Sequence, residues 1–141
     1  MFFTLLLGAA AVAAPAPKIP TLEIAPNVNL PMTGLGTWQY NDTVAEAAVA
    51  LALSLGYPHI DTAIGYGNQE GIARALKASG RPRSSYFITS KVPGGLTQAG
   101  ATAQLEQSVQ QLVRAVPPIP ARHTAQCHLV PYHRRRRNAG N

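Results

Sequence analysis

The chain has 141 residues, of which 46% are hydrophobic and 13% are charged, so it is the size of one ordinary domain and has ample apolar content for a core. Its net charge of +6 arises after residue 113, because residues 1–113 hold equal numbers of basic and acidic residues while residues 114–141 hold arginines and no acid. The zero net charge of residues 1–113 argues against a nucleic-acid partner. The single cysteine, Cys127, excludes an internal disulfide and a cysteine-rich zinc site, and we expect no metal.

The first 17 residues, MFFTLLLGAAAVAAPAP, are an uncharged apolar run that passes into small residues. This pattern predicts a signal peptide, with Ala11-Val12-Ala13 as the cleavage site. The run is too short for a membrane span, which needs ~20 apolar residues. We therefore expect the protein in the secretory pathway. An uncleaved apolar leader on a cytoplasmic protein is the alternative.

The next segments predict a hairpin, a strand and a helix. Residues 21–30 alternate around the turn formers Pro26 and Asn27, which is typical of a hairpin. Residues 32–40 are strand-like. The run of alanine and leucine over residues 43–55 predicts a helix, with Asp42 or Thr43 as its cap and Gly56 as its stop.

Two further pairs of a strand and a helix follow. Residues 57–63 are a short apolar run and predict a buried strand, and a helix to residue 79 follows, with Asn68 as its cap. Residues 86–92, YFITSKV, predict a third strand, and residues 97–113 predict a third helix. Alternating strands and helices of these lengths predict an α/β fold with a parallel sheet.

Three polar residues occupy the positions where such sheets place catalysis, at the carboxyl ends of strands. Asp61 is near the end of the second βα strand, Tyr66 follows it, and Lys91 is near the end of the third. A free phenol is a poor acid at neutral pH, but an ammonium beside it stabilises the phenolate, and a carboxylate can hold that ammonium in place. The trio therefore suits the protonation of a carbonyl oxygen while hydride arrives at the carbon. Taken singly, these residues are more often a cap, a packing aromatic and a solvated strand end.

The sequence around Asp61, Tyr66 and Lys91 resembles the aldo-keto reductase signature. Residues 56–70 read GYPHIDTAIGYGNQE, and in that family a strand carries the aspartate and the catalytic tyrosine follows five residues later. Residues 87–92, FITSKV, resemble the family's lysine strand, and residues 30–38, LPMTGLGTW, its first barrel strand. The resemblance runs in order over residues 21–112.

The resemblance implies a (β/α)8 TIM barrel, of which this chain would hold the N-terminal portion, truncated after the third βα unit. It also implies NADPH as the hydride donor and an aldehyde or ketone as the substrate. Tyr66 would be the general acid, tuned by Lys91 and Asp61. The cofactor and substrate site would be lined by Gly36, Thr37, Trp38 and Asp61.

The chain departs from the family after the third helix. The family's fourth catalytic group is a histidine that ends an apolar strand, but residues 113–120 read VRAVPPIP. His123 stands at nearly the family's separation from Lys91, yet the prolines before it remove the amide donors that a central strand needs. We expect residues 113–141, rich in proline, arginine and histidine, to be a disordered tail.

Three functions of different classes follow from these observations. The chain is a reductase of small carbonyl compounds in incomplete form. Alternatively, it is a non-catalytic product of a truncated or incorrect gene structure. In the third reading it is a binding fragment that uses the basic run Arg134–Arg137 on nucleic acid or an anionic membrane. The sequence leaves the particular substrate and the oligomeric state open.

Overall fold

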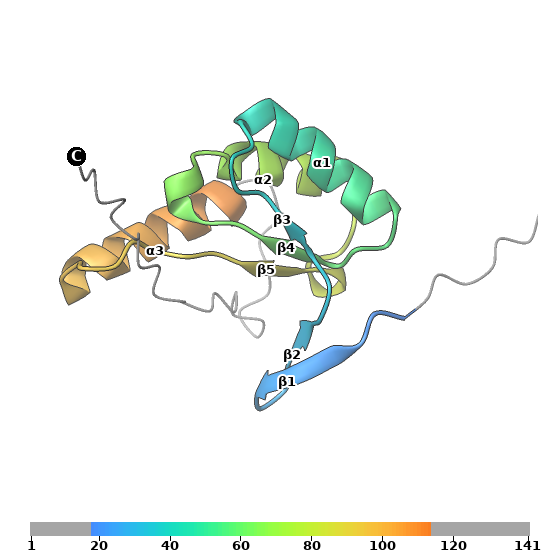
Figure 1. Cartoon of the computed structure of the whole chain (residues 1–141), viewed down its shortest axis with the longest axis horizontal. Helices are drawn as coiled ribbons and strands as arrows, with labels where there is room; N and C mark the ends of the chain where they lie inside the picture. The colour runs from blue at the N-terminus through green and yellow to red at the C-terminus, as the bar shows by residue number, and fades with distance from the viewer. Residues whose placement is uncertain (1–17, 114–141) are drawn as a thin grey trace, which may run out of the picture.

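The computed structural model describes residues 18–113. These residues form a short hairpin, a parallel sheet and three α-helices (Figure 1). The strands are β1 (Thr21–Ala25), β2 (Val28–Pro31), β3 (Leu35–Gly36), β4 (His59–Asp61) and β5 (Phe87–Thr89). The helices are α1 (Asp42–Ser54), α2 (Gln69–Ala78) and α3 (Gln98–Val113), with short 3-10 helices η1 (Ile64–Tyr66) and η2 (Arg83–Ser85).

The predicted signal peptide, residues 1–17, lies outside the described residues. So does the predicted tail, except for Val113, which ends α3. His123 and the arginine run belong to that tail and are likewise outside the described residues.

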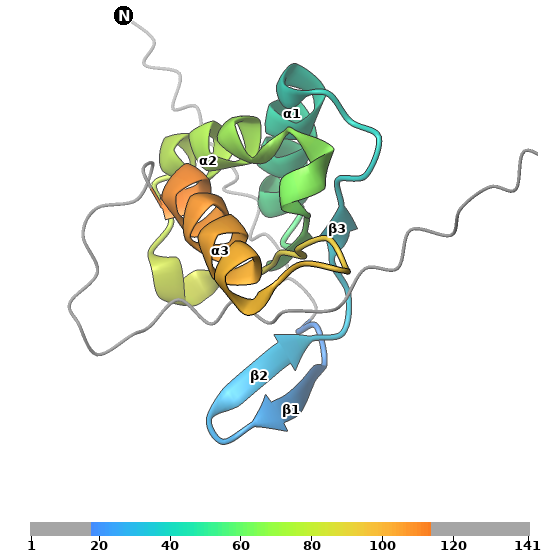
Figure 2. The same cartoon turned by 90° about the vertical axis from the view of Figure 1, so that its left-hand side faces the viewer.

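The N-terminal hairpin is present as predicted. β1 and β2 pair antiparallel, and the turn places Asn27 at a φ of 63°. The Asn27 amide donates to the Glu23 carboxylate at 3.1 Å, which helps to close the turn. The hairpin lies below the sheet, away from the helices (Figures 1 and 2).

The predicted parallel sheet is also present, in the order β3-β4-β5. Leu35 is in register with Ile60 and Ile60 with Ile88, so apolar residues of all three strands lie in one row. Ile60 is fully buried and Ile88 nearly so, and they form a core with residues of the helices. α1 and α2 pack over this face, and α3 lies beside α2 (Figure 2). Within residues 18–113 the sheet does not close into a barrel.

α1 begins one residue before the predicted range, and its cap is not one of the two residues expected. The Asn41 side chain caps the helix by accepting from the Val44 amide at 2.9 Å. Asp42 instead accepts from the Gly71 amide at 2.6 Å and from the Arg74 guanidinium at 2.5 Å, and so joins α1 to α2. The Arg74 hydrogen bond holds the pKa of the Asp42 carboxyl below its usual range.

The two helices approach closely at Gly71. A Cβ added there would lie 2.0 Å from the Asp42 carbonyl oxygen, which is main chain and has no flexible end to yield. Glycine is therefore required at this crossing, because any larger residue would push α2 away from α1.

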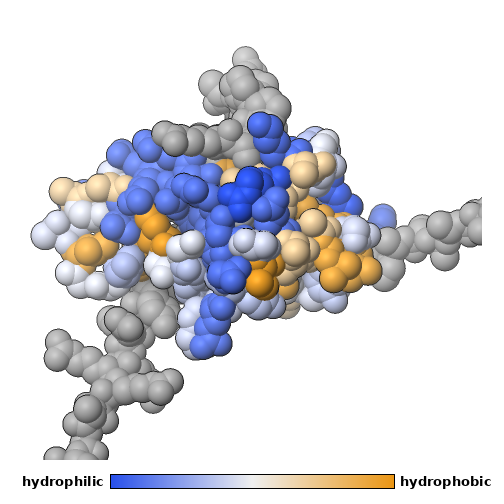
Figure 3. Space-filling model, turned by 90° about the horizontal axis from the view of Figure 1, so that it is seen from above, coloured by the Kyte–Doolittle hydropathy of each residue, from blue (hydrophilic) through white to orange (hydrophobic). Residues whose placement is uncertain are grey.

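One flank of α1 is apolar and exposed. Val44, Leu51 and Leu55 have exposed fractions of 45%, 60% and 65%, whereas Ala45 and Val49 on the flank toward α2 are fully buried. Seen from above, hydrophobic surface lies at the end of the molecule where α1 ends (Figure 3). The three helices of the described part thus leave this flank of α1 without a neighbouring helix.

Candidate active site

The candidate site lies at the carboxyl edge of the sheet, where β4 and β5 end side by side. Main-chain hydrogen bonds continue the parallel pairing past both strands. The Thr62 amide donates to the Thr89 carbonyl at 2.8 Å, and the Ile64 amide donates to the Lys91 carbonyl at 3.2 Å. Asp61 therefore ends β4, and Tyr66 and Lys91 lie in the connections after β4 and β5, whose backbones are joined to one another.

The ion pair expected between the two strand ends is present. The Lys91 ammonium donates to the Asp61 carboxylate and, at 3.2 Å, to the Thr62 carbonyl. The Lys91 side chain is only 16% exposed, whereas that of Asp61 is 37% exposed. The ammonium is thus held from two sides in a largely desolvated position, where its charge acts more strongly than it would in water.

Tyr66 lies beside the same ammonium. It ends the short helix η1, and its ring centre is 5.5 Å from the Lys91 ammonium nitrogen. The Tyr66 side chain is half-buried, so part of the residue remains accessible. The structure therefore brings together the three residues that the sequence predicted as the reacting group. A carboxylate, an ammonium and a phenol are the groups that general acid catalysis by a tyrosine would need.

Two of the residues expected to line a cofactor site lie on open surface. Gly36 ends β3 in register with Asp61, and a Cβ added to it would meet nothing within 4 Å. Trp38 follows two residues later and is 61% exposed.

Thr37 faces inward instead. It is fully buried, and its amide and hydroxyl both donate to the Asp61 carbonyl, at 3.0 and 3.2 Å. In this structure the Thr37 side chain supports the strand that carries Asp61.

His59 was not singled out from the sequence, although its position two residues before Asp61 places both on one face of β4. Its Nδ1 lies 3.2 Å from the Pro31 carbonyl and its Nε2 lies 2.9 Å from the Thr89 hydroxyl. Because a carbonyl can only accept, Nδ1 carries the proton and Thr89 donates to Nε2. Burial lowers the pKa of the His59 imidazole, and the ring thus links the hairpin to β5 in its neutral form.

Sequence reasoning also missed two buried amides. Asn68 and Gln69 are 0% and 1% exposed and lie between Tyr66 and the body of α2. Asn68 was expected to cap α2, but its side chain makes no capping hydrogen bond. It donates instead to the Thr37 carbonyl at 2.8 Å and the Tyr40 carbonyl at 3.0 Å. These hydrogen bonds depend on the segment of Thr37 and Tyr40 packing against the start of α2, which the local sequence does not indicate. The local sequence favours the cap.

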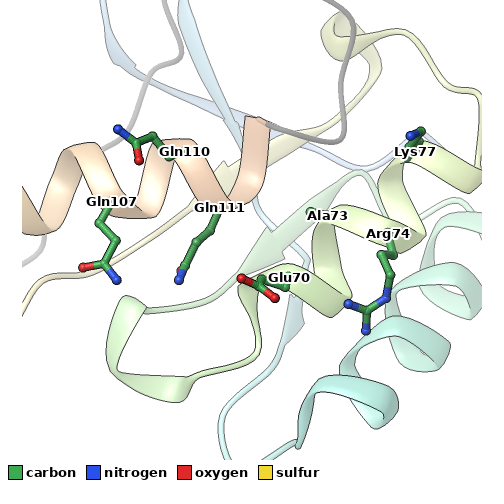
Figure 4. Close-up of a pocket in the computed structure, with 7 residues that line it drawn as sticks. All are labelled: Glu70, Ala73, Arg74, Lys77, Gln107, Gln110 and Gln111. Carbon is green, nitrogen blue, oxygen red and sulfur yellow. The ribbon is translucent and has the colours of Figure 1, made fainter.

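Two pockets lie away from the trio. One, of about 510 Å³, runs between α2 and α3 and is lined by polar side chains such as Glu70, Arg74 and Gln107 (Figure 4). The other, of about 450 Å³, lies toward the hairpin and includes Thr21 and Phe87.

Among residues 18–113, no group of three or more histidine, cysteine, aspartate or glutamate side chains is placed to hold a metal ion. A search over the same residues finds no helix that is both long enough and apolar enough to cross a membrane.

Comparisons with known proteins show the family to which this chain is related. The sequence model of the Aldo/keto reductase family matches residues 32–116. An aldo-keto reductase of Mycolicibacterium smegmatis is 41% identical over 97 residues, which cover 65% of this chain and 34% of that protein. The aldehyde reductase YPR1 of Saccharomyces cerevisiae is 40% identical over 92 residues, covering 65% of this chain and 29% of that protein. The chain thus spans about a third of the length of the curated relatives it matches.

Solved structures give the same answer for the fold. An aldo/keto reductase from Brucella melitensis matches with a TM-score of 0.63 and 34% identity, over 67% of this chain and 37% of that chain. The aldose reductase from Schistosoma japonicum matches with a TM-score of 0.60 and 30% identity, over 67% of this chain and 33% of that chain. The predicted fold class, an N-terminal portion of a TIM barrel, is confirmed. By sequence and by structure, this chain belongs to the aldo/keto reductase family.

Proposed function

We propose that this chain carries the proton-donating part of an active site that reduces an aldehyde or ketone to an alcohol with NADPH. The observation that carries the proposal is the cluster of Asp61, Lys91 and Tyr66 at the carboxyl edge of two adjoining parallel strands. Functional residues of (β/α)8 barrels gather at that edge. One relative is named an aldehyde reductase, which supports the same substrate class for this chain.

Each member of the cluster has a separate task in the proposed reaction. The Tyr66 hydroxyl gives its proton to the carbonyl oxygen as hydride arrives at the carbonyl carbon, so the product is the alcohol and the tyrosine is left as phenolate. The Lys91 ammonium stabilises that phenolate charge. Asp61 pairs with the ammonium, and the Thr62 carbonyl accepts from it at 3.2 Å, so the two hold it in place. The phenolate then regains a proton from solvent.

Open surface at the end of β3 supports the binding of a flat ring there. A Cβ added to Gly36 at the end of β3 would meet nothing within 4 Å, and Trp38, two residues later, is exposed. NADPH, when bound, supplies the hydride. Gly36, Trp38 and Asp61 would hold its reactive ring near Tyr66. The family resemblance favours NADPH over NADH as the hydride donor.

The experiment that tests the proposal places the segment in a closed barrel. Residues 32–112 of this chain would replace the matching segment of the Mycolicibacterium smegmatis relative, to which the chain is 41% identical. We expect this hybrid barrel to reduce an aromatic aldehyde, with a matching loss of NADPH absorbance. The same assay would be run with NADH in parallel. A hybrid that folds and binds NADPH but reduces no carbonyl compound would contradict the proposal.

Replacing Lys91 with methionine in the hybrid barrel is expected to lower the turnover number by about 10²-fold or more. The methionine fills similar space but leaves the phenolate without its neighbouring cation. The measurement is steady-state aldehyde reduction. Lys77→Met, on the exposed side of α2, is the matched control and should leave turnover unchanged. Equal rates in both variants would remove Lys91 from the proposed role.

A further inference from the structure

The start of α2 carries two consecutive buried amides, Asn68 and Gln69. A buried amide costs stability unless it is hydrogen-bonded, and an asparagine at a helix start usually recovers that cost by capping the helix. Asn68 makes no such bond, and the Gln69 Oε1 atom is buried with no hydrogen-bond partner. The hydrogen bonds that these two side chains do make lead out of α2, to residues beside Asp61 and Lys91.

Asn68 holds the strand end that carries Asp61. Its Nδ2 donates to the Thr37 carbonyl at 2.8 Å, and its Oδ1 accepts from the Thr62 hydroxyl at 3.3 Å. Thr37 in turn donates twice to the Asp61 carbonyl. Thr37, which binds the Asp61 carbonyl, and Thr62, which follows Asp61 in the chain, are thus both hydrogen-bonded to the Asn68 side chain. Asn68 itself lies two positions after Tyr66.

Gln69 holds the segment that carries Lys91. Its Nε2 donates to the Ser90 hydroxyl at 2.8 Å and to the Ser108 hydroxyl of α3 at 2.9 Å, and the two hydroxyls lie 2.8 Å apart. All three side chains are at most 1% exposed. Ser90 directly precedes Lys91, so this closed triangle fixes the residue next to the ammonium-bearing one.

We infer that Asn68 and Gln69 are positioning residues that set Asp61 and Lys91 against Tyr66. Tyr66 lies in the same connection as the two amides, and each amide reaches a different strand end. The side-chain hydrogen bonds of Asn68 and Gln69 go to residues other than Asp61, Tyr66 and Lys91. The inference rests on the proposed function, because it assigns these amides to the geometry of the proton transfer. A misplacement of about 1 Å in such a site can cost ~10²-fold in rate.

Gln69→Leu in the hybrid barrel separates positioning from stability. The substitution removes two hydrogen bonds, but it also removes the unpartnered oxygen, and Ser90 and Ser108 keep their mutual hydrogen bond, so thermal stability should change little. We expect the turnover number to fall by ~10- to 100-fold at unchanged NADPH affinity. Gln107→Leu, on the exposed side of α3, is the matched control and should have no effect.

Ser108→Ala removes one corner of the triangle from a separate helix. It should lower turnover less than Gln69→Leu, and the double variant should be no slower than Gln69→Leu alone. Full turnover in Gln69→Leu would overturn the inference. A fall in turnover that follows a loss of melting temperature or of NADPH affinity would overturn it too.

A second measurement does not depend on activity. The Ile64 amide donates to the Lys91 carbonyl, whereas the Ile72 amide donates to the Asn68 carbonyl within α2. Gln69→Leu should speed hydrogen exchange at Ile64 and leave exchange at Ile72 unchanged. Equal exchange at Ile64 in both proteins would overturn the inference. An unsubstituted hybrid without activity would count against the proposed function, and the exchange result would still decide the positioning role.

Discussion

Replacing Tyr66 with phenylalanine in the hybrid barrel is expected to lower carbonyl reduction by ~10²–10⁴-fold and to leave NADPH binding nearly unchanged. Only the hydroxyl is lost. The phenylalanine ring can still pack at the same place, 5.5 Å from the Lys91 ammonium nitrogen. Steady-state kinetics would give the turnover number, and quenching of protein fluorescence would report cofactor binding.

Tyr57→Phe is the matched control for this experiment. Tyr57 precedes β4, at the opposite end of that strand from Asp61, and is 37% exposed. It should lose a hydroxyl without loss of turnover. A Tyr66→Phe hybrid that kept more than about a tenth of the unsubstituted rate would exclude Tyr66 as the general acid.

The proximity of the trio could be predicted because it depends on topology. A strand–helix–strand unit puts successive strands parallel, so their carboxyl ends reach the same edge. Asp61 and Lys91 belong to consecutive units, and the register of His59 with Phe87 and of Asp61 with Thr89 brings them into contact. Tyr66 follows within a short connection and has little freedom to lie elsewhere.

The supporting hydrogen bonds could not be predicted, because they join residues that are far apart in sequence. The Asn68 side chain donates to the carbonyls of Thr37 and Tyr40, which are 31 and 28 positions away, and does not cap its own helix. Asp42 likewise accepts from the Gly71 amide, and Asn41 caps α1. Either asparagine or aspartate can cap a helix, so local sequence could not choose between neighbours.

Strand lengths were overestimated for a related reason. Residues 32–40 were expected to be one strand, but only Leu35 and Gly36 pair with β4. The chain leaves the sheet soon after, and Gln39 adopts a φ of 67°, outside the extended region. Apolar and aromatic residues such as Trp38 favour a strand locally. Here Trp38 lies beyond the paired segment and on the surface.

The isolated polypeptide of residues 14–141 is expected to show neither cooperative unfolding nor measurable NADPH-dependent reduction. In a barrel, each strand is covered by helices on one face and by side chains from across the barrel on the other. Residues 18–113 supply only the first cover. The exposed flank of α1, with Leu51 at 60% and Leu55 at 65%, also lacks a neighbour. Domains are stable by only ~5–15 kcal/mol, so losing half of the apolar burial should exceed that margin while the cost of ordering each residue is unchanged.

A thermal melt of this polypeptide followed by circular dichroism, with and without NADPH, would test the expectation. The hybrid barrel is the control. It supplies the side chains from across the barrel that cover the second face of the sheet, so it should melt in one sharp step. Ligand that binds only the folded state raises the melting temperature. A sharp transition of the isolated polypeptide that NADPH moved upward would show that the hairpin, the three-stranded sheet and the three helices suffice for a folded, cofactor-binding unit. It would also direct attention to His123 as a fourth catalytic group.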